Sequence, residues 1–403
     1  MSQRVFITGF GIITSIGKNA EENLHALIRG KFGYGELNVL DTVHRNSLAA
    51  CEIKIPDNKL CEHAGVKPHG GFTRTALLGL LALQEAIRSA GLSPTDLQSS
   101  GLISATTTGG IREFEKYYDE LMNPEVIGQF QAFTDTATSG EHCERMADHV
   151  GIKKYLATIS TACSSSANAI MHGAQLIKHN KLDRIICGGT EALSKFTVNG
   201  FNSLMILDKE HCRPFDSSRN GLNLGEGAAY IVLESEKEID RSRRNPLAEL
   251  KGYGNANDAF HLTASSPEGE GALSAMTLAL STAGIKPNEV DYINAHGTAT
   301  ENNDLSEGLG LKRLFGEQVP YFSSTKPFTG HTLAAAGSIE AVYCLMAIKE
   351  SLIWPNLNFK SAMPELGIEP VKQLIQKINL KNVLSNSFGF GGNTSSLLLA
   401  SVR

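Results

Sequence analysis

The segment from Thr332 to Lys349 constrains the fold more than any other part of the sequence. Read as a helix, it has apolar side chains on nearly every side, namely Leu333, Ala334, Ala335, Ala336, Ile339, Ala341, Val342, Leu345, Met346 and Ile348. A helix that is apolar all round is buried on all sides. We therefore predict that this helix lies at the centre of the fold, between other layers.

A faint internal repeat predicts a second helix of the same kind. The sequence AGLSP at 90–94 recurs as AGIKP at 283–287, and each copy reads as the end of a helix, a turn and then a strand. Cys163 precedes one alanine-rich helical segment, and His331 precedes another. Two copies of an α/β unit explain both echoes. They would place two buried helices between two sheets, with further helices outside.

Composition excludes several classes of protein. The 403 residues include 37 basic and 42 acidic ones, a net charge of −5, so nothing favours nucleic-acid binding. The 7 cysteines are scattered, none at close metal-ligand spacing, which favours reduced thiols and no metal site. The first residues lack the pattern of a secretory signal, and no apolar run reaches membrane-spanning length. We expect a cytoplasmic protein.

Cys163 is the candidate nucleophile. It stands between a β-rich approach and a run of small residues that leads into a helical pattern. A thiol at a helix N-terminus meets unpaired backbone N–H groups and the positive end of the helix dipole. These surroundings lower the pKa of a cysteine and offer donors to an oxyanion. The alternative is a buried free cysteine that packs as a small apolar side chain.

Two later stretches carry histidines in apolar surroundings. The sequence NAHGTAT at 294–300 follows a predicted strand, where ligands bind in α/β sheets, and it contains His296. The alternative is a histidine whose ring is satisfied by neighbouring backbone. The sequence SSTKPFTGH at 323–331 brings Lys326 and His331 to the start of the buried helix.

Two further features support a site there. Lys326 either lies at the surface or enters the interior, where it needs a partner, and Glu340 within the buried helix is the candidate. The sequence NSFGFGGN at 386–393 is rich in glycine, which allows close backbone approach, although a plain β-turn is the alternative.

Taken together, these motifs resemble the motif set of the β-ketoacyl-acyl-carrier-protein synthases, and they occur in the family order. The set is TACSS at 161–165, NAHGTAT, STK followed by TGH, and NSFGFGG, with RPFD at 213–216 and GEGA at 225–228. The likeness runs from Arg4 to Leu399 and is closest to the elongating Cys-His-His class, types I and II. It implies an α/β fold, the duplicated thiolase-like αβαβα five-layer sandwich. The halves would be 1–240, with the nucleophilic cysteine, and 241–403, with the two histidines and the glycine-rich loop.

The resemblance also implies a reaction. The enzyme would catalyse decarboxylative Claisen condensation of an acyl-enzyme thioester with malonyl-acyl carrier protein, giving 3-oxoacyl carrier protein in fatty-acid or polyene/polyketide biosynthesis. Cys163 would carry the acyl group, and the backbone N–H groups of Cys163 and Phe390 would form the oxyanion hole. His296 and His331 would stabilise the enolate as hydrogen-bond donors, and Lys326 would tune them electrostatically. Phe390 is similar to the family's gate residue.

Other positions are expected from the same resemblance. Supporting residues of the site would be Glu340, Asp304, Thr298, Thr300 and Asn386. Thr108 stands where the housekeeping type often carries an apolar residue of the acyl pocket. Lys67, Arg74 and Arg213 are the candidates for docking an acidic carrier protein, because basic residues would steer its encounter.

The implied partners follow the family. The acyl chain would arrive on the phosphopantetheine of acyl carrier protein, with no metal or organic cofactor. The family forms two-fold dimers in which sheets pair across the axis, so we expect a homodimer, or a heterodimer with a related synthase subunit.

Three other readings compete with this one. A biosynthetic thiolase would need a second cysteine in the late glycine-rich loop, and the initiating synthases pair their cysteine with His and Asn. A non-catalytic subunit resembling a chain-length factor usually lacks the nucleophile. Two departures from the elongating pattern bear on the substrate rather than the reaction: Asn393-Thr394 reverses the usual Thr-Asn order, and Gly221-Leu222-Asn223-Leu224 replaces Gly-Phe-Val-Leu.

Overall fold

Strands and helices follow one another along the chain in two similar series. The structure, a computed structural model, describes residues 3–68, 70–123, 125 and 129–402. The first series comprises β1 (Val5–Thr14), α1 (Ala20–Ile28), β2 (Gly35–Glu36), β3 (Ala49–Ala50), α2 (Asp57–Ala64), α3 (Arg74–Ser89), α4 (Pro94–Gln98), β4 (Gly101–Ala105), α5 (Ile111–Leu121), η1 (Gln129–Ala137), α6 (Glu141–Val150), β5 (Tyr155–Ile159), α7 (Ser165–Lys178), β6 (Arg184–Glu191), α8 (Lys195–Ser203) and β7 (Gly227–Ser235).

The second series comprises α9 (Glu236–Ser242), β8 (Ala248–Asn257), α10 (Glu270–Ala283), η2 (Pro287–Glu289), β9 (Tyr292–Asn294), α11 (Glu301–Phe315), β10 (Tyr321–Ser323), α12 (Lys326–Thr329), η3 (Leu333–Ala335), α13 (Ala336–Glu350), β11 (Leu352–Ile353), β12 (Ile375–Gln376), β13 (Asn382–Phe388) and β14 (Asn393–Ala400). The repeated turns at 90–94 and 283–287 lead into β4 and β9, which hold matching places in the two series.

The two series build two half-sheets with the same topology. The strand order is β5-β4-β6-β7-β1 in one half and β10-β9-β13-β14-β8 in the other. In each half the first three strands are parallel and the last two join antiparallel. The sequence predicts two separate sheets, but β1 and β8 pair at Phe6–Ile7 and Ala248–Glu249, so the halves form one ten-stranded sheet.

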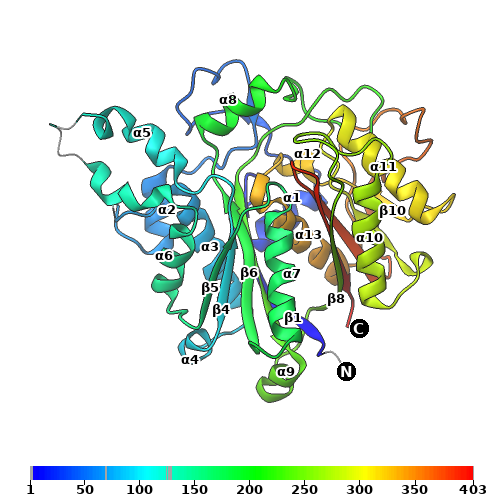
Figure 1. The fold of residues 1–403 in the computed structure, drawn as a ribbon, viewed down its shortest axis with the longest axis horizontal. Helices are drawn as coiled ribbons and strands as arrows, with labels where there is room; N and C mark the ends of the chain where they lie inside the picture. Colours follow the sequence, from blue (N-terminus) through cyan, green and yellow to red (C-terminus); the bar gives the residue numbers. More distant parts are fainter. Residues whose placement is uncertain (1–2, 69, 124, 126–128, 403) are drawn as a thin grey trace.

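Helices α7 and α13 form the predicted central layer (Figure 1). They pack against each other, and each contacts strands of both halves: α13 contacts β7 and β13, and α7 contacts β6 and β14. Outside, α3 covers β1 and β7, while α10 covers β8 and β14. Every residue of α13 from Ala336 to Ile348 is buried, as the all-round apolar pattern predicts. The five-layer α/β fold class is therefore confirmed.

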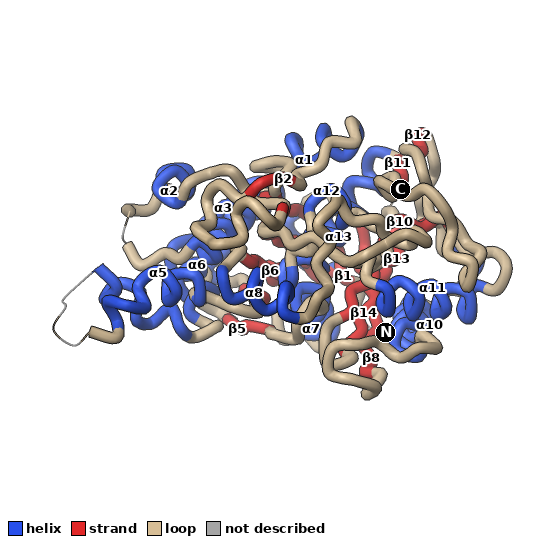
Figure 2. Tube along the Cα trace, turned by 90° about the horizontal axis from the view of Figure 1, so that it is seen from above, coloured by secondary structure: helices blue, strands red, loops and turns tan. Residues whose placement is uncertain are grey.

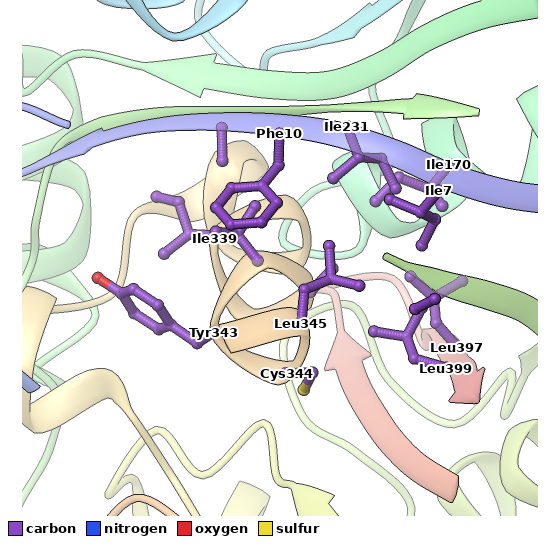
Figure 3. Close-up of a cluster of buried hydrophobic side chains, with 14 of the residues drawn as sticks. Ile7, Phe10, Ile170, Ile231, Ile339, Tyr343, Cys344, Leu345, Leu397 and Leu399 are labelled. Atoms are coloured by element: carbon purple, nitrogen blue, oxygen red, sulfur yellow. The ribbon is translucent and has the colours of Figure 1, made fainter. Parts of the chain in front are cut away.

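The central layer carries the main hydrophobic core. Figure 3 shows Ile339 and Leu345 of α13 among side chains of β1, α7 and β14, including Phe10, Ile170 and Leu397. Each such side chain stabilises the fold by about 1.5–3 kcal/mol when fully buried. This packing fixes the N-terminal ends of α7 and α13, where the candidate catalytic residues lie.

Helices α5, η1 and α6 lie between β4 and β5 in the chain. Helices α5 and α6 lie at the left end of the molecule in Figure 1, and the view from above in Figure 2 places them at the same end. Within the described ranges, no helix combines the length and the apolar character needed to cross a bilayer.

Candidate active site

Cys163 lies on a strained turn between β5 and α7. Ala162 has a positive φ of 52°, an unusual conformation for a residue other than glycine. Ser164 is the residue before the first turn of α7, so Cys163 lies just outside the helix N-terminus. The glycine-rich loop passes very close to this turn, because a Cβ on Gly389 would lie 2.7 Å from the Thr161 carbonyl oxygen. Only glycine fits there, which explains the loop's composition.

The structure brings the sulfur and both imidazoles to one cavity. Cys163, His296, His331 and Phe390 all line a pocket of about 290 Å³. The two imidazole rings lie edge to face, with centroids 5.4 Å apart. His296 follows β9, and His331 lies between α12 and the start of the central helix. Cys163 and His331 are 168 positions apart in the sequence, and the structure brings them to one cavity as the motifs predict.

Lys326 is buried and holds His296 in one tautomer. Its Nζ lies 3.2 Å from His296 Nδ1, 2.5 Å from the His296 carbonyl oxygen and 2.6 Å from Glu340 Oε1. An ammonium has only hydrogens to give, so Nδ1 must accept. The ring proton is then on Nε2, which makes His296 a hydrogen-bond donor. Glu340 is the partner that the sequence predicts for this lysine.

Both imidazoles are neutral in this site. Burial lowers the pKa of His296 well below its usual range, and the positive charge of Lys326 and the neighbouring His331 add to the shift. Burial and Lys326 lower the pKa of His331 in the same direction. For Glu340, burial raises the pKa to about 7 against the pull of Lys326. A neutral imidazole can donate its ring N–H to a negative charge that develops during the reaction.

The prediction that the turn lowers the pKa of Cys163 is wrong for the resting thiol. Burial raises that pKa to about 12, although the charge of Lys326 and the backbone N–H of Phe390 act in the opposite direction. Cys163 is only 5% exposed, so removal of water outweighs the favourable neighbours. The thiol is therefore protonated in this structure at neutral pH.

Two buried carboxylates fix the loop that carries His296. Glu307 accepts the backbone N–H groups of His296 at 2.9 Å and of Gly297 at 2.8 Å. Burial raises its pKa to about 7. Asp304, one turn earlier on α11, accepts the N–H groups of Ala299 at 3.1 Å and Phe215 at 2.7 Å. The sequence reasoning included Asp304 and missed Glu307, although two acids three residues apart on one helix signal a shared buried face.

The other supporting candidates lie around the same loop. Thr298 and Thr300 line the cavity, and their hydroxyl groups are 2.8 Å apart. Asn386 does not reach the cavity, but its amide donates to Glu307 at 3.1 Å. Phe390 lines the cavity and stacks on Phe201 with ring centroids 5.8 Å apart. The aromatic pair therefore forms one wall near Cys163.

Thr108 is not part of this pocket. It is absent from the cavity lining, and its hydroxyl donates to the buried carboxylate of Glu191 at 2.7 Å. Thr106 and Thr107 donate to the same carboxylate. The hydroxyl groups of all three threonines donate hydrogen bonds to Glu191. Thr108 therefore faces this carboxylate and does not line the cavity.

Arg74 is wrong as a carrier-docking residue. It is fully buried, pairs with Glu226 at 2.6 Å and 3.0 Å, and also binds Asp57 at 2.6 Å. Arg213 is mostly covered, and it pairs with the buried Asp208 and the exposed Glu210. Of the three candidates only Lys67 is exposed. Arg74 cannot meet a partner protein, because its guanidinium compensates a carboxylate in the interior.

The cavity has two kinds of lining. Its apolar part is formed by Phe201, Ile206, Leu222, Phe388 and Phe390, and its polar part by Thr263, Ser265, Thr298, Thr300, Glu301, Asn302 and Asn303. Such a lining fits a substrate with a polar arm and an apolar group near the sulfur. Among the described residues, no group of three or more His, Cys, Asp or Glu side chains is placed to hold a metal ion.

Comparisons with known proteins agree with this geometry. Residues 2–238 match the N-terminal domain of beta-ketoacyl synthases, and residues 247–360 match the C-terminal domain. The chain is 32% identical to 3-oxoacyl-[acyl-carrier-protein] synthase 2 of Staphylococcus aureus, over 98% of each chain. Its structure is similar to the ishigamide ketosynthase/chain length factor, with a TM-score of 0.93, 29% identity and full coverage of both chains. It is also similar to a ketosynthase in complex with its chain length factor from Xenorhabdus doucetiae, with a TM-score of 0.83, 30% identity and coverage of 99% and 98%.

A thiolase-like fold with a cysteine and two neutral histidines in one pocket defines a condensing enzyme. The chain belongs to the beta-ketoacyl synthase family. The predicted enzyme class, an acyltransferase that forms carbon–carbon bonds as a β-ketoacyl-acyl-carrier-protein synthase, is confirmed.

Proposed function

We propose that Cys163, His296 and His331 divide the condensation into two half-reactions. In the first, the Cys163 sulfur attacks the carbonyl of an acyl thioester on a carrier protein. The bond to the carrier sulfur breaks, and the thiol proton leaves with the carrier thiol. The backbone N–H groups of Cys163 and Phe390 hold the oxyanion. Support comes from the Phe390 N–H, which faces the sulfur closely enough to act on its pKa.

In the second half-reaction a malonyl thioester enters the same pocket. Its bond to the carboxylate carbon breaks, carbon dioxide leaves, and the electron pair forms an enolate. The Nε2–H groups of His296 and His331 donate to the enolate oxygen. The enolate carbon attacks the acyl group, the bond to Cys163 breaks, and a 3-oxoacyl carrier is released. Lys326 maintains the His296 tautomer, and Glu340 balances its charge.

One observation carries this proposal: the sulfur and two neutral imidazoles line a single cavity. The same observation disfavours a non-catalytic subunit, because such a role needs none of these side chains. The test is incubation of the purified protein with acyl and malonyl carrier proteins, with mass spectrometry of Cys163 and of the carrier products. Changing Cys163 to Ala should abolish acyl transfer while leaving some malonyl decarboxylation.

Cys61→Ala is the matched control. Cys61 is another free, buried cysteine, it lies on α2, and it lines no part of the pocket. It should leave both half-reactions unchanged. Equal loss of acyl transfer and decarboxylation in Cys163→Ala would contradict the division of roles.

The remaining features of the family are proposed for this chain as well. Acyl groups arrive on carrier-protein phosphopantetheine, with no further cofactor, in the cytoplasm. The halves divide at residues 240 and 241. The chain pairs with a second, homologous subunit through β5, one of the two edge strands of the ten-stranded sheet. Sedimentation of the purified chain, alone and with a candidate partner subunit, tests the pairing.

A further inference from the structure

The reversed Asn393-Thr394 pair has a structural role that the catalytic residues do not explain. Asn393 is the first residue of β14 and directly follows the glycine-rich loop. Its side-chain oxygen accepts hydrogen bonds from Ser164 Oγ at 2.6 Å, Asn168 Nδ2 at 2.9 Å and Asn255 Nδ2 at 3.0 Å. One amide oxygen thus joins three segments that are far apart in the sequence.

Two of these three donors follow the nucleophile closely in the chain. Ser164 is the residue after Cys163, and Asn168 lies one turn along α7. Asn168 also donates to the Thr161 hydroxyl at 2.9 Å, on the other side of Cys163. The amide of Asn393 therefore fixes the turn that carries the sulfur from its helical side.

The backbone of Asn393 closes the loop that carries Phe390. Its carbonyl oxygen accepts the N–H of Gly389 at 2.8 Å, so residues 389–393 form a tight turn. Gly391 and Gly392 both have positive φ, 85° and 78°, which lets the chain reverse between them. The opposite side of this turn is held separately, because Asn257 donates to the Gly391 carbonyl at 2.9 Å.

We propose that Asn393 is a positioning residue that ties the Phe390 loop to the Cys163 turn, so that the Phe390 N–H points at the reacting sulfur. It acts on the acyl-transfer half-reaction, because the histidines are held by other groups. Glu307, Asp304 and Lys326 fix the His296 loop, and none of them contacts Asn393. The half-reaction test rests on the proposed function, and the thiol test below does not.

The first measurement is the rate at which iodoacetamide alkylates Cys163 at a fixed pH of about 8, where only a small fraction of the thiol is ionised and the rate follows that fraction. In Asn393→Ala the Phe390 N–H is no longer held against the sulfur, so alkylation should be slower than in the wild type. This readout needs no carrier protein, and it therefore stands even if the wild-type chain shows no condensation. An unchanged alkylation rate would overturn the proposal.

The second measurement compares the half-reactions in Asn393→Ala. Acylation of Cys163 by an acyl carrier should slow about tenfold, the effect of one well-placed hydrogen bond. Decarboxylation of malonyl carrier should stay within about twofold. A loss of both activities by the same factor would show a merely structural role. Asn393→Asp keeps the oxygen that all three donors share, and it should recover most of the acylation rate.

Two further variants control the interpretation. Asn382→Ala removes another buried asparagine, at the start of β13, whose amide donates to the Glu289 carbonyl at 2.9 Å far along the strand from the site. It should lower stability without changing the rate of Cys163 alkylation. Asn393→Ala combined with Asn168→Ala should slow acylation by less than the product of the two single effects, since the two variants share the bond from Asn168 Nδ2 to Asn393 Oδ1. Additive losses would contradict the proposed tether.

Discussion

Replacing Arg74 decides between a docking role and an interior role for this residue. The guanidinium is fully buried and donates to both carboxylate oxygens of Glu226, at 2.6 Å and 3.0 Å. It also donates to the carbonyl oxygens of Ile53 at 2.8 Å and Ile55 at 2.9 Å. Arg74→Met keeps most of the side-chain volume but removes the closest cation from the buried carboxylate of Glu226, which keeps only two backbone N–H donors and Arg112 at 3.9 Å.

The magnitude follows from that geometry. Removal of one partner from a buried ion pair costs about 3–5 kcal/mol, because the remaining charge loses its main partner. We expect Arg74→Met to lower the free energy of unfolding by that amount in urea titrations. Replacing both partners, as in Arg74→Met with Glu226→Met, should recover most of the loss, since two apolar side chains leave no charge behind. Lys67→Met is the surface control and should change stability by less than about 0.5 kcal/mol.

The same variants are then tested for carrier binding over a salt series. Arg74→Met, measured below its unfolding midpoint, should keep the salt dependence of the wild type, whereas Lys67→Met should reduce it. Unchanged stability in Arg74→Met, together with weaker and less salt-dependent carrier binding, would refute the reasoning and restore the docking role.

Three further predictions concern histidines and their partner. His296→Ala and His331→Ala should each slow malonyl decarboxylation about a hundredfold, the scale of a lost oxyanion donor, with a much smaller effect on Cys163 acylation; equal effects on both steps would contradict their role as enolate donors. Lys326→Met removes the group that holds His296 Nδ1 as an acceptor, so decarboxylation measured by release of carbon dioxide should fall in that variant too. Burial lowers the pKa of His142 from 6.5 to about 4, so the native state binds fewer protons than the unfolded state between these values. Stability should therefore fall as pH drops from 6.5 to 4, by about 3 kcal/mol in total from this residue; urea midpoints of His142→Gln should lack that part of the slope, and an identical slope would disprove it.

The features that could be predicted from sequence are those written in local patterns. The burial of α13 follows from apolar residues on every side of one helix, and the duplication follows from two similar turns before β4 and β9. The meeting of the cysteine and the two histidines was predictable for a different reason. Their motifs resemble those of the β-ketoacyl synthases and occur in the family order. The resemblance therefore implies the fold that brings them together.

The features that were missed depend on partners far away in the chain. Arg74 pairs with Glu226, 152 residues later, and nothing near either residue in the sequence announces the pairing. Thr108 turns to Glu191, 83 residues away, for the same reason. The pKa of Cys163 depends on a balance between burial and Lys326, and only the three-dimensional packing decides that balance. Glu307 was missed although it lies three residues after Asp304 on α11, because its hydrogen bonds go to backbone N–H groups of another segment, at His296 and Gly297.

The matching positions of Cys163 and His331, one before α7 and one before the segment that leads into α13, have a consequence for how the enzyme can be taken apart. A chain cut between β7 and β8 would leave the sulfur on one fragment and both imidazoles on the other. Neither fragment could turn over alone, and activity would return only on complementation of the two. The catalytic centre is thus itself an interface between duplicated halves, so substitutions along the β1–β8 seam should register as changes in turnover.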